Sequence, residues 1–332
     1  MKQVYVQEPL KIAIFDAPQP EAHDSNGIVI KVMATGICAT DVHTFLGETI
    51  HGKHYPFHIG HEIAGKVVAV GSEVSCVVVG DSVVVNPLIY CGTCGECASG
   101  HWNYCKNVKA LGLTGPGGFS DYVYTIEQNI SKFSRKSPQE MSFAEPLATV
   151  LHAIDLLDEL NLSSSILIQG AGTLGLLFLK ALSWKVPGIS ICVSDPDVRR
   201  HVLIHQNHGK AVVPEHITDH FSIIIDCSGN VKAVQAATTM LKDHGTLLLF
   251  GVCPQDSKLE IDPFYVYRHE LTIKGAYALN NNIDKAAKLI DEGHIEVQDL
   301  ISAVIPREAL LETLQGLANR NLSGKYVVQL EG

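Results

Sequence analysis

The sequence predicts a two-domain α/β protein in which a β-rich domain accompanies a doubly wound parallel sheet. At 332 residues the chain is too long for one ordinary core and suits two domains. The first third consists of short β-branched runs broken by Pro and Gly, which is typical of a compact β-rich unit. After Ser163, apolar strands alternate with helical segments, which indicates a parallel sheet covered on both faces.

The β-rich part is expected to contain a series of short strands, over 4–6, 11–15, 28–34, 63–70, 77–85 and 119–124. A short helix is expected after Gly36, and apolar residues at helical spacing predict an amphipathic helix over 140–160. Residues 91–105 show no hydrophobic period and are expected to form a loop.

The alternating part is expected to place strands at 166–169, 189–193, 221–226, 246–250 and 271–274, with helices over 174–183, 198–207 and 231–241. The tail adds helices over 283–291 and 307–318 and a last strand over 326–330. The stretches 195–200 and 280–282 are expected to be solvated turns.

Composition excludes several classes of function. A hydrophobic content of 46% with 18% charge is globular, and a net charge of −10 argues against nucleic acid or an anionic membrane as partner. No apolar run is long enough to cross a bilayer, and the first residues lack the apolar segment of a signal peptide. A cytoplasmic protein with reduced thiols is expected.

A glycine-rich turn predicts a dinucleotide site. Gly170-Ala171-Gly172-Thr173-Leu174-Gly175 has the form G-x-G-x-x-G, follows an apolar strand and opens a helix. Such glycines let the backbone approach a pyrophosphate, and the helix start offers amide donors. This context predicts a Rossmann sheet with the cofactor on the turn.

The acid that follows this turn favours NAD over NADP. Asp195 lies 20 residues past Gly175, where it would accept from the adenosine ribose hydroxyls and repel a 2′-phosphate. Arg199 and Arg200 lie nearby, and because an arginine can receive that phosphate, NADP remains the alternative. Arg200 is included among the expected cofactor contacts.

Four cysteines with metal-ligand spacing predict a structural zinc site. They follow the pattern C-x2-C-x2-C-x7-C, at Cys91, Cys94, Cys97 and Cys105. A closed tetrahedral site of four thiolates is what structural zinc prefers. Disulfides and an iron–sulfur cluster are the alternatives.

A second set of donors suits a catalytic zinc. Cys38, His61, Glu62 and Glu145 supply the thiolate, imidazole and carboxylate groups that such an ion accepts. They are far apart in sequence, so their spacing alone does not establish a site.

The arrangement of motifs resembles the zinc-dependent medium-chain dehydrogenases, the superfamily of the zinc alcohol dehydrogenases, and within it the sorbitol, polyol and threonine dehydrogenase branch. The resemblance runs nearly end to end. It rests on residues 36–43, 60–65, 70–74, 80–85, 117–122 and 145–147, on the four cysteines and on the glycine-rich turn.

The resemblance implies roles for individual residues. Cys38 and His61 would hold the catalytic zinc, with Glu62 and Glu145 as direct or water-mediated ligands, so each chain would bind two zinc ions. Asp41 would orient His61. Thr40 would accept the substrate proton and His43 would pass it toward solvent, although a helix N-cap for Thr40 and a surface histidine for His43 are alternatives.

The resemblance also implies the reaction. Zinc would polarise a substrate hydroxyl, and a hydride would pass to the nicotinamide in a dry cleft between the domains. Ser228 and Gly251 follow the ends of predicted strands and, by resemblance, line the nicotinamide; ordinary turn chemistry is the alternative. Histidines at 51, 54 and 58, with Tyr55 and Phe57, form either the rim of a pocket or a solvated loop.

The predicted organisation is a GroES-like domain over 1–147, rejoined by 285–332, with a Rossmann domain over 148–284. The expected substrate is a small-molecule alcohol with a secondary hydroxyl: a polyol, sugar alcohol, cyclitol or amino alcohol. Threonine or a sugar-alcohol phosphate is an alternative, for which the loop after Cys38 offers Lys53 as its single cation. The other alternative is a regulatory zinc- and nucleotide-binding protein without turnover. The superfamily implies a homodimer or homotetramer joined at the sheet edge near 246–250 and 271.

Overall fold

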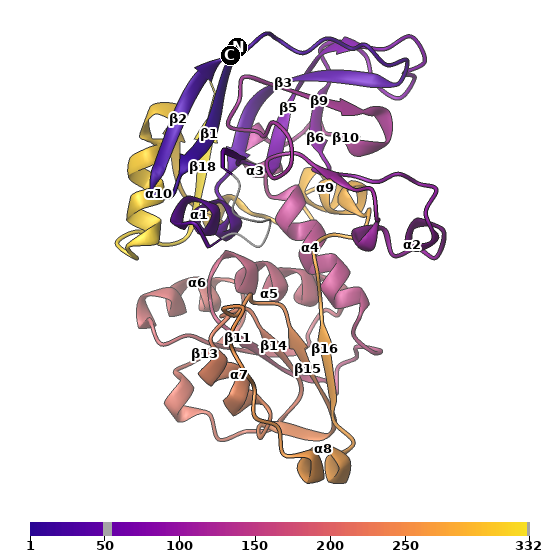
Figure 1. The fold of residues 1–332 in the computed structure, drawn as a ribbon. Helices are drawn as coiled ribbons and strands as arrows, with labels where there is room; N and C mark the ends of the chain where they lie inside the picture. The colour runs from indigo at the N-terminus through magenta and orange to yellow at the C-terminus, as the bar shows by residue number, and fades with distance from the viewer. Residues whose placement is uncertain (49–54, 331–332) are drawn as a thin grey trace. The chain divides into compact units, whose positions relative to one another are not determined.

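The computed structural model describes residues 1–48 and 55–330, and the chain forms two compact units (Figure 1). The first unit comprises Met1–Ala148 and Leu279–Gly332, and the second comprises Thr149–Ala278. His51, Lys53 and His54 lie outside the described residues. Within those that are described, no helix has the length and apolar character needed to cross a membrane.

The first unit is built on β-sheets. A seven-stranded sheet has the order β10-β6-β5-β3-β18-β17, with β9 also paired to β3, and smaller sheets have the orders β2-β1-β4 and β7-β8. The strands are β1 (Lys2–Glu8), β2 (Lys11–Asp16), β3 (Gly27–Gly36), β4 (Phe57–His58), β5 (Glu62–Val70), β6 (Ser82–Val85), β7 (Leu88–Ile89), β8 (Lys109–Ala110), β9 (Tyr122–Ile126), β10 (Ile130–Lys132), β17 (Ile301–Pro306) and β18 (Lys325–Gln329).

Strand β3 organises this unit. It is mostly buried and pairs antiparallel with β5, β9 and β18. Its last residue, Gly36, lies opposite Glu62 of β5 and Val327 of β18. The register therefore brings the segment after Gly36, the start of β5 and the start of the C-terminal strand to one place.

The second unit contains a parallel sheet with the strand order β13-β12-β11-β14-β15-β16. In chain order this is 3-2-1-4-5-6, the doubly wound Rossmann arrangement, which confirms the predicted fold class. Its strands are β11 (Ser165–Gln169), β12 (Ser190–Ser194), β13 (Lys210–Val212), β14 (Phe221–Asp226), β15 (Leu241–Leu249) and β16 (Thr272–Gly275).

The helices are α1 (Ala39–Leu46), α2 (Gly95–Ala98), α3 (Pro138–Met141), α4 (Ala144–Asp155), α5 (Thr173–Lys185), α6 (His201–Gln206), α7 (Val231–Ala237), α8 (Pro263–His269), α9 (Ile283–Asp291) and α10 (Leu310–Ala318). Short 3-10 helices occur at Trp102–Tyr104, Glu127–Asn129, Val198–Arg200, Pro214–His216, Gln298–Leu300 and Arg307–Ala309. In the first unit, α9 packs on β10 and β6 (Figure 1).

Two sequence predictions for the first unit and the start of the second were too long. The helix expected over 140–160 is two helices, α3 and α4, and the second ends at Asp155. The strand expected over 77–85 is limited to β6, because Val78 and Val79 are exposed in a turn completed by Gly80, whose φ is +99°.

Candidate metal centres and cofactor site

Asp41 joins the two segments that carry the first candidate ligands. Cys38 occupies the N-cap of α1, and its backbone N–H donates to Asp41 Oδ2 at 2.8 Å. The backbone N–H of Gly60, next to His61, donates to Asp41 Oδ1 at 2.8 Å. Asp41 is fully buried. Through these two hydrogen bonds its single carboxylate holds the backbones of both ligand segments.

Cys38, His61 and Glu62 form one group of potential metal ligands. One donor atom from each lies within 4.8 Å of the others. His61 Nδ1 is buried without a hydrogen-bond partner, 3.7 Å from Asp41 Oδ1, whereas Glu62 Oε2 has the ammonium group of Lys325 as its ionic partner. Buried polar atoms normally have partners, so this donor set fits a cation.

Glu145 lies nearby but outside that group of three. It is in the first turn of α4 and is buried. Burial raises the pKa of Glu145 to about 7, an effect that His61 opposes and Glu62 reinforces. The charge of Glu145 is therefore coupled to the group, while its carboxylate does not share the 4.8 Å cluster.

Lys325 is a member of this region that the sequence did not predict. Its ammonium group donates to Glu62 and, at 3.1 Å, to the backbone carbonyl of Ile37. Both charged side chains are almost fully buried. A Cβ on Gly36 would lie 1.9 Å from Glu62 Oε2, so only glycine leaves room for the pair. The available sequence signal was a lysine at the start of a buried C-terminal strand.

The charges around His61 favour a cation. Burial by itself lowers the pKa of His61, but Asp41, Cys38 and Glu145 together raise it well above its ordinary value. The surroundings therefore stabilise positive charge at the imidazole, which a bound metal ion would supply.

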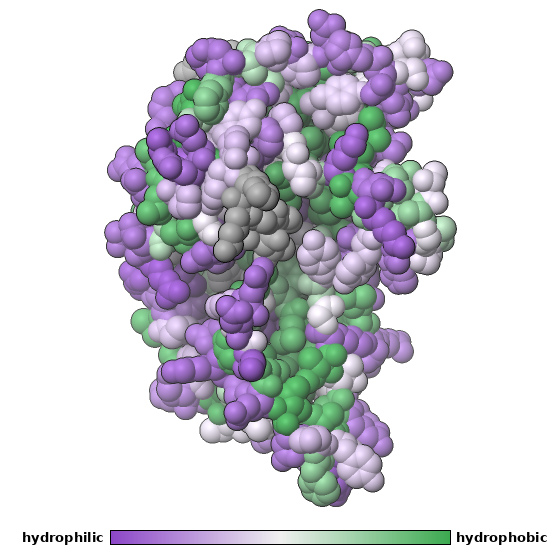
Figure 2. Space-filling view, viewed as in Figure 1, coloured by the Kyte–Doolittle hydropathy of each residue, from purple (hydrophilic) through white to green (hydrophobic). Residues whose placement is uncertain are grey.

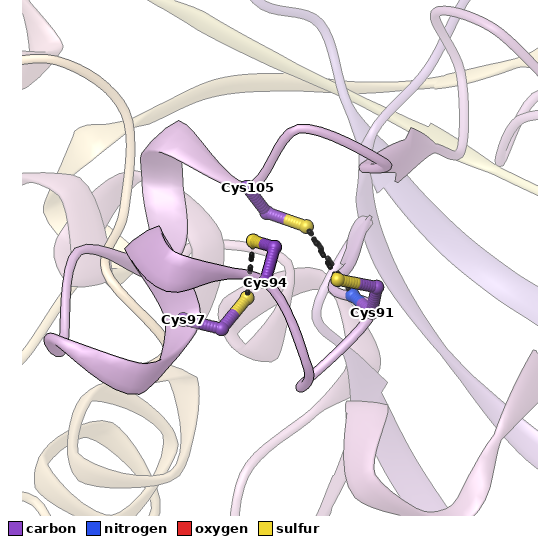
Figure 3. A group of neighbouring side chains, drawn as sticks. All are labelled: Cys91, Cys94, Cys97 and Cys105. Carbon is purple, nitrogen blue, oxygen red and sulfur yellow. Dashed lines mark hydrogen bonds between the residues drawn. The ribbon is translucent and has the colours of Figure 1, made fainter.

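The four predicted cysteines of the loop converge into a second group (Figure 3). The Sγ atoms of Cys94 and Cys97 are 3.5 Å apart, as are those of Cys91 and Cys105, and all four lie within 4.8 Å. Disulfide sulfurs would be about 2.05 Å apart. A zinc tetrahedron with arms of ~2.3 Å has edges of about 3.8 Å, which fits these spacings.

Electrostatics in the loop also favour a cation. Backbone N–H groups of Thr93 and Cys94 lower the pKa of Cys91 to about 5, whereas burial raises the pKa of Cys97 to about 12. Four thiolates this close repel one another, so full deprotonation requires a positive ion among them. Tyr90 and Trp102 pack against the group.

Thr40 and His43 lie on α1, after the N-cap cysteine. Thr40 Oγ1 is 3.8 Å from Cys38 Sγ. The N-cap alternative for Thr40 does not hold, because Cys38 takes that position. His43 is half exposed, and its Nδ1 is 2.8 Å from Glu48 Oε2.

The aromatic residues that precede β5 have mainly packing contacts. Tyr55 and Phe57 pack against the core of the first unit. His58 packs against Tyr5 with ring centroids 4.5 Å apart and ring planes tilted by 50°. Burial lowers the pKa of His58.

In the second unit, the glycine-rich turn has the shape that a dinucleotide requires. Gly170 has φ +101°, and Gly172 is the N-cap of α5, where an added Cβ would meet no atom within 4 Å. A Cβ on Gly175 would lie 1.9 Å from the carbonyl oxygen of Gly170. Thr173 and Leu174 open the helix. The turn thus leaves open space beside free helix amides, which fits a pyrophosphate.

Asp195 follows β12 and is buried, contrary to the solvated turn expected there. Its Oδ2 accepts from the backbone N–H of Ala171, at 2.8 Å, and from Arg200 Nη1, at 3.1 Å. Arg199 pairs with Asp197 instead. Asp195 and Arg200 therefore lie together at the glycine-rich turn.

Ser228 and Gly251 lie at neighbouring strand ends. The backbone N–H of Ser228 and its hydroxyl donate to Asp226 Oδ1, at 3.0 and 2.6 Å. The backbone N–H of Gly251 donates to the carbonyl of Asp226 at 2.7 Å. Burial raises the pKa of Asp226. The carboxyl ends of β14 and β15 are thereby held together, at the edge where ligands of such sheets bind.

The turn at 280–282 is also not simply solvated. Asn280 and Asn282 are half-buried and make side-chain hydrogen bonds to backbone groups of the four-cysteine loop and of α4. Nothing in the local sequence distinguishes them from asparagines of an ordinary turn.

Comparison with known proteins covers most of the chain. Residues 24–135 match the alcohol dehydrogenase GroES-like domain, and residues 200–292 match the zinc-binding dehydrogenase family. D-arabitol-phosphate dehydrogenase of Enterococcus avium is 30% identical over 95% of both chains. D-altritol 5-dehydrogenase of Agrobacterium fabrum is 29% identical over 85% of this chain and 86% of its own.

A solved structure gives the same picture. A protein of Sinorhizobium meliloti 1021, described as a zinc-binding dehydrogenase and crystallised with NADP, superposes with a TM-score of 0.90 at 28% identity, covering 99% of each chain. Fold, ligand groups and relatives together define a zinc-binding dehydrogenase.

The chain belongs to the zinc-dependent medium-chain dehydrogenases, in their polyol-dehydrogenase branch, and it is an oxidoreductase acting on alcohols. The resemblance predicted from the sequence is confirmed at this level.

Proposed function

We propose that this protein oxidises a secondary hydroxyl of a polyol or sugar alcohol to a ketone, with NAD as hydride acceptor. The observation that carries the proposal is the buried group of Cys38, His61 and Glu62, in surroundings that favour a cation. Its relatives act on altritol and arabitol phosphate according to their names.

Two zinc ions per chain fit the two groups of donors. Cys38 and His61 would hold the catalytic ion, with Glu62 or Glu145 completing its shell, and the four cysteines would hold the structural ion. When bound, zinc supplies Lewis acidity toward the substrate hydroxyl, and the nicotinamide supplies the hydride acceptor.

The protein's own residues prepare the hydroxyl and move its proton. Asp41 fixes the backbones of the ligand segments, and Lys325 holds Glu62 by its carboxylate. Thr40, beside Cys38, relays the proton: it takes up the proton that leaves the substrate hydroxyl while its own hydroxyl proton moves on toward His43. His43, half exposed on the same helix, passes that proton to solvent.

Gly170, Gly172, Thr173, Leu174 and Gly175 would bind the pyrophosphate. Asp195 and Arg200 would contact the adenosine ribose, and Ser228 and Gly251 the nicotinamide. We expect Asp195→Ala to raise the preference for NADP about tenfold, since a lost charge repulsion of ~1.4 kcal/mol has that effect. Asp219→Ala, at an exposed position just before β14, is the control; an unchanged cofactor ratio in Asp195→Ala kinetics would remove Asp195 from the ribose site.

The domain assignment that we propose is a catalytic domain over 1–147 and 285–332 and a cofactor domain over 148–284. The two compact units, which divide after Ala148 and before Leu279, support this assignment.

We also propose a cytoplasmic homodimer or homotetramer. All nine cysteines of the chain lie among the described residues and are unpaired, as in a reducing compartment. Strand β16 is at the sheet edge, and the second unit exposes apolar side chains, among them Val252, Phe264 and Ile273. Apolar area is also visible on this unit in Figure 2. Light scattering of the purified protein tests the assembly, and a monomer would contradict it.

A substrate screen tests the reaction. NADH formation should appear with at least one member of a panel of polyols, cyclitols and amino alcohols. The panel includes threonine and sugar-alcohol phosphates, because relatives are named for substrates of both kinds. Zinc near one ion per chain, with no NADH formed from any member, would instead favour a regulatory zinc- and nucleotide-binding protein.

A further inference from the structure

The segment Leu279–Asn282, where the chain rejoins the first unit, is bonded to the four-cysteine loop. Asn280 Oδ1 accepts from the backbone N–H of Trp102 at 2.9 Å, and its Nδ2 donates to the carbonyl of Gly100 at 3.0 Å. Both backbone groups lie between Cys97 and Cys105. From the other side of the loop, the hydroxyl of Tyr90 donates to the carbonyl of Leu279 at 3.2 Å.

The same segment is bonded to the helix that carries Glu145. Asn282 Nδ2 donates to the carbonyl of Ala148 at 2.8 Å, one turn along α4 from Glu145. Asn282 Oδ1 accepts from the backbone N–H of Asn280 at 3.2 Å. The two asparagines thus form a continuous chain of hydrogen bonds from the cysteine loop to α4.

The backbone of this segment needs such contacts. Asn281 has φ +53° and Ala278, just before the segment, has φ +54°. Left-handed backbone is unfavourable for most residues other than glycine, and alanine lacks the local side-chain hydrogen bonding that lets asparagine adopt it more readily. The hydrogen bonds of Asn280 and Asn282 flank Asn281 and stabilise this backbone conformation.

We propose that Asn280 and Asn282 are positioning residues through which the ordered four-cysteine loop fixes α4 and so strengthens metal binding at the Cys38–His61–Glu62–Glu145 centre. This rests on the two zinc sites of the proposed function. Coupling of this kind is reciprocal: metal in either site strengthens binding in the other.

Two substitutions separate this role from simple loop anchoring. Asn282→Asp keeps the acceptor for Asn280 but removes the donor to Ala148, at almost unchanged size. Asn280→Asp likewise keeps the acceptor for Trp102 and removes the donor to Gly100. Asn161→Ala is the control, because Asn161 caps an exposed turn of the second unit through Ser163.

The measurement is metal release from the full-length, cobalt-loaded enzyme mixed with excess chelator. Absorption bands of cobalt distinguish a four-thiolate site from one with a single thiolate. We expect five- to tenfold faster release from the single-thiolate site in Asn280→Asp and Asn282→Asp, and no change in Asn161→Ala. The double variant should release metal at about the same rate as either single variant, because the two substitutions break the same chain of hydrogen bonds.

Release at the wild-type rate in both aspartate variants would overturn the inference while leaving the proposed function intact. A wild-type enzyme that binds cobalt only at the four cysteines would instead overturn the proposed function. If Asn280→Asp loses metal from the cysteine loop itself, Asn282→Asp, which does not touch the loop, decides: faster release there supports the coupling, and wild-type release refutes it.

Discussion

The two candidate metal centres lie in one unit of the chain but are assembled in opposite ways. All four donors of the cysteine loop lie within Cys91–Cys105, on a short loop. The other centre gathers Cys38, His61 and Glu62 where the end of β3 lies opposite the start of β5, with Glu145 and Lys325 contributed from farther along the chain. One centre is local and the other depends on the whole sheet.

Their chemistry differs in the same sense. Four thiolates saturate a tetrahedral ion and leave no position for substrate. The mixed group has fewer donors within 4.8 Å, leaves His61 Nδ1 buried without a hydrogen-bond partner and is balanced by a buried lysine. These differences support the structural role that we propose for the first centre and the catalytic role that we propose for the second, and each can be tested by breaking one centre while measuring both.

The largest effect is expected on breaking the local centre. Cys105→Ser should remove one zinc ion per chain and much of a metal-binding free energy that is on the order of 10 kcal/mol for structural zinc. Metal analysis and thermal unfolding measure this loss. Cys76→Ser, at an exposed cysteine outside both groups, is the control and should unfold as the wild type does. A Cys105→Ser protein of unchanged stability would contradict a structural role.

Breaking the centre of Cys38, His61 and Glu62 should instead remove activity and leave the zinc ion of the cysteine loop in place. Cys38→Ser is expected to lower kcat/KM on the order of 10⁴-fold, since Lewis-acid stabilisation is worth several kcal/mol and each 1.36 kcal/mol is tenfold. NAD binding and the zinc ion of the cysteine loop should persist, as calorimetry and metal analysis would show. Turnover at the wild-type rate would remove Cys38 from the reaction.

Lys325→Met tests a feature that the two centres do not share, because the four cysteines have no buried ion pair like that of Lys325 with Glu62. Removing one partner of a buried pair leaves an uncompensated charge and costs about 3–5 kcal/mol. Chemical denaturation should show this loss, with Lys325→Arg intermediate. Lys11→Met, which breaks the exposed pair with Glu8, should change stability by less than about 1 kcal/mol. Equal effects of the two methionine variants would mean that Glu62 is not held by Lys325.

The smallest expected effect concerns pH. Glu145 has a pKa of about 7 in the folded chain against an ordinary value of 4.5. Its neutral form therefore stabilises the metal-stripped protein fully below about pH 4.5, and this stability is lost as pH rises through 7. Since one pKa unit is worth about 1.4 kcal/mol, the loss reaches about 3 kcal/mol.

Urea unfolding of chelator-treated protein between pH 4.5 and 8 measures this effect. Glu145→Gln should remove that part of the pH dependence, because glutamine does not titrate, and added zinc should restore stability at pH 8 in the wild type. Parallel pH curves for the stripped wild type and Glu145→Gln would show that burial does not shift the Glu145 carboxyl.

The same contrast explains what the sequence could predict. The cysteine spacing and the glycine-rich turn are local signals, so Cys91 to Cys105 and Gly170 to Gly175 could be located by inspection. Cys38 and His61 were placed by resemblance to a family, because only the pairing of β3 with β5 brings them together. Lys325 could not be found, since its partner lies 263 residues away.

Smaller errors have local causes as well. The sequence predicts no strand at β13, because its three residues are too few to show a hydrophobic period. Val78 and Val79 read as a strand because β-branched residues favour one, yet the turn at Gly80 leaves them exposed. Asn280 and Asn282 carry turn chemistry in the sequence, and only the fold shows that the turn is bonded to both the cysteine loop and α4.

The central claim is that one chain holds two zinc ions of which one is catalytic. Native mass spectrometry during exposure to a chelator, with NADH formation assayed on the same samples, tests it most directly. We predict two zinc ions per chain at the start and loss of activity in step with the first ion released, while the second remains in the cysteine loop. Activity that survives release of the first ion, or a single zinc ion in the fully active enzyme, would contradict the claim.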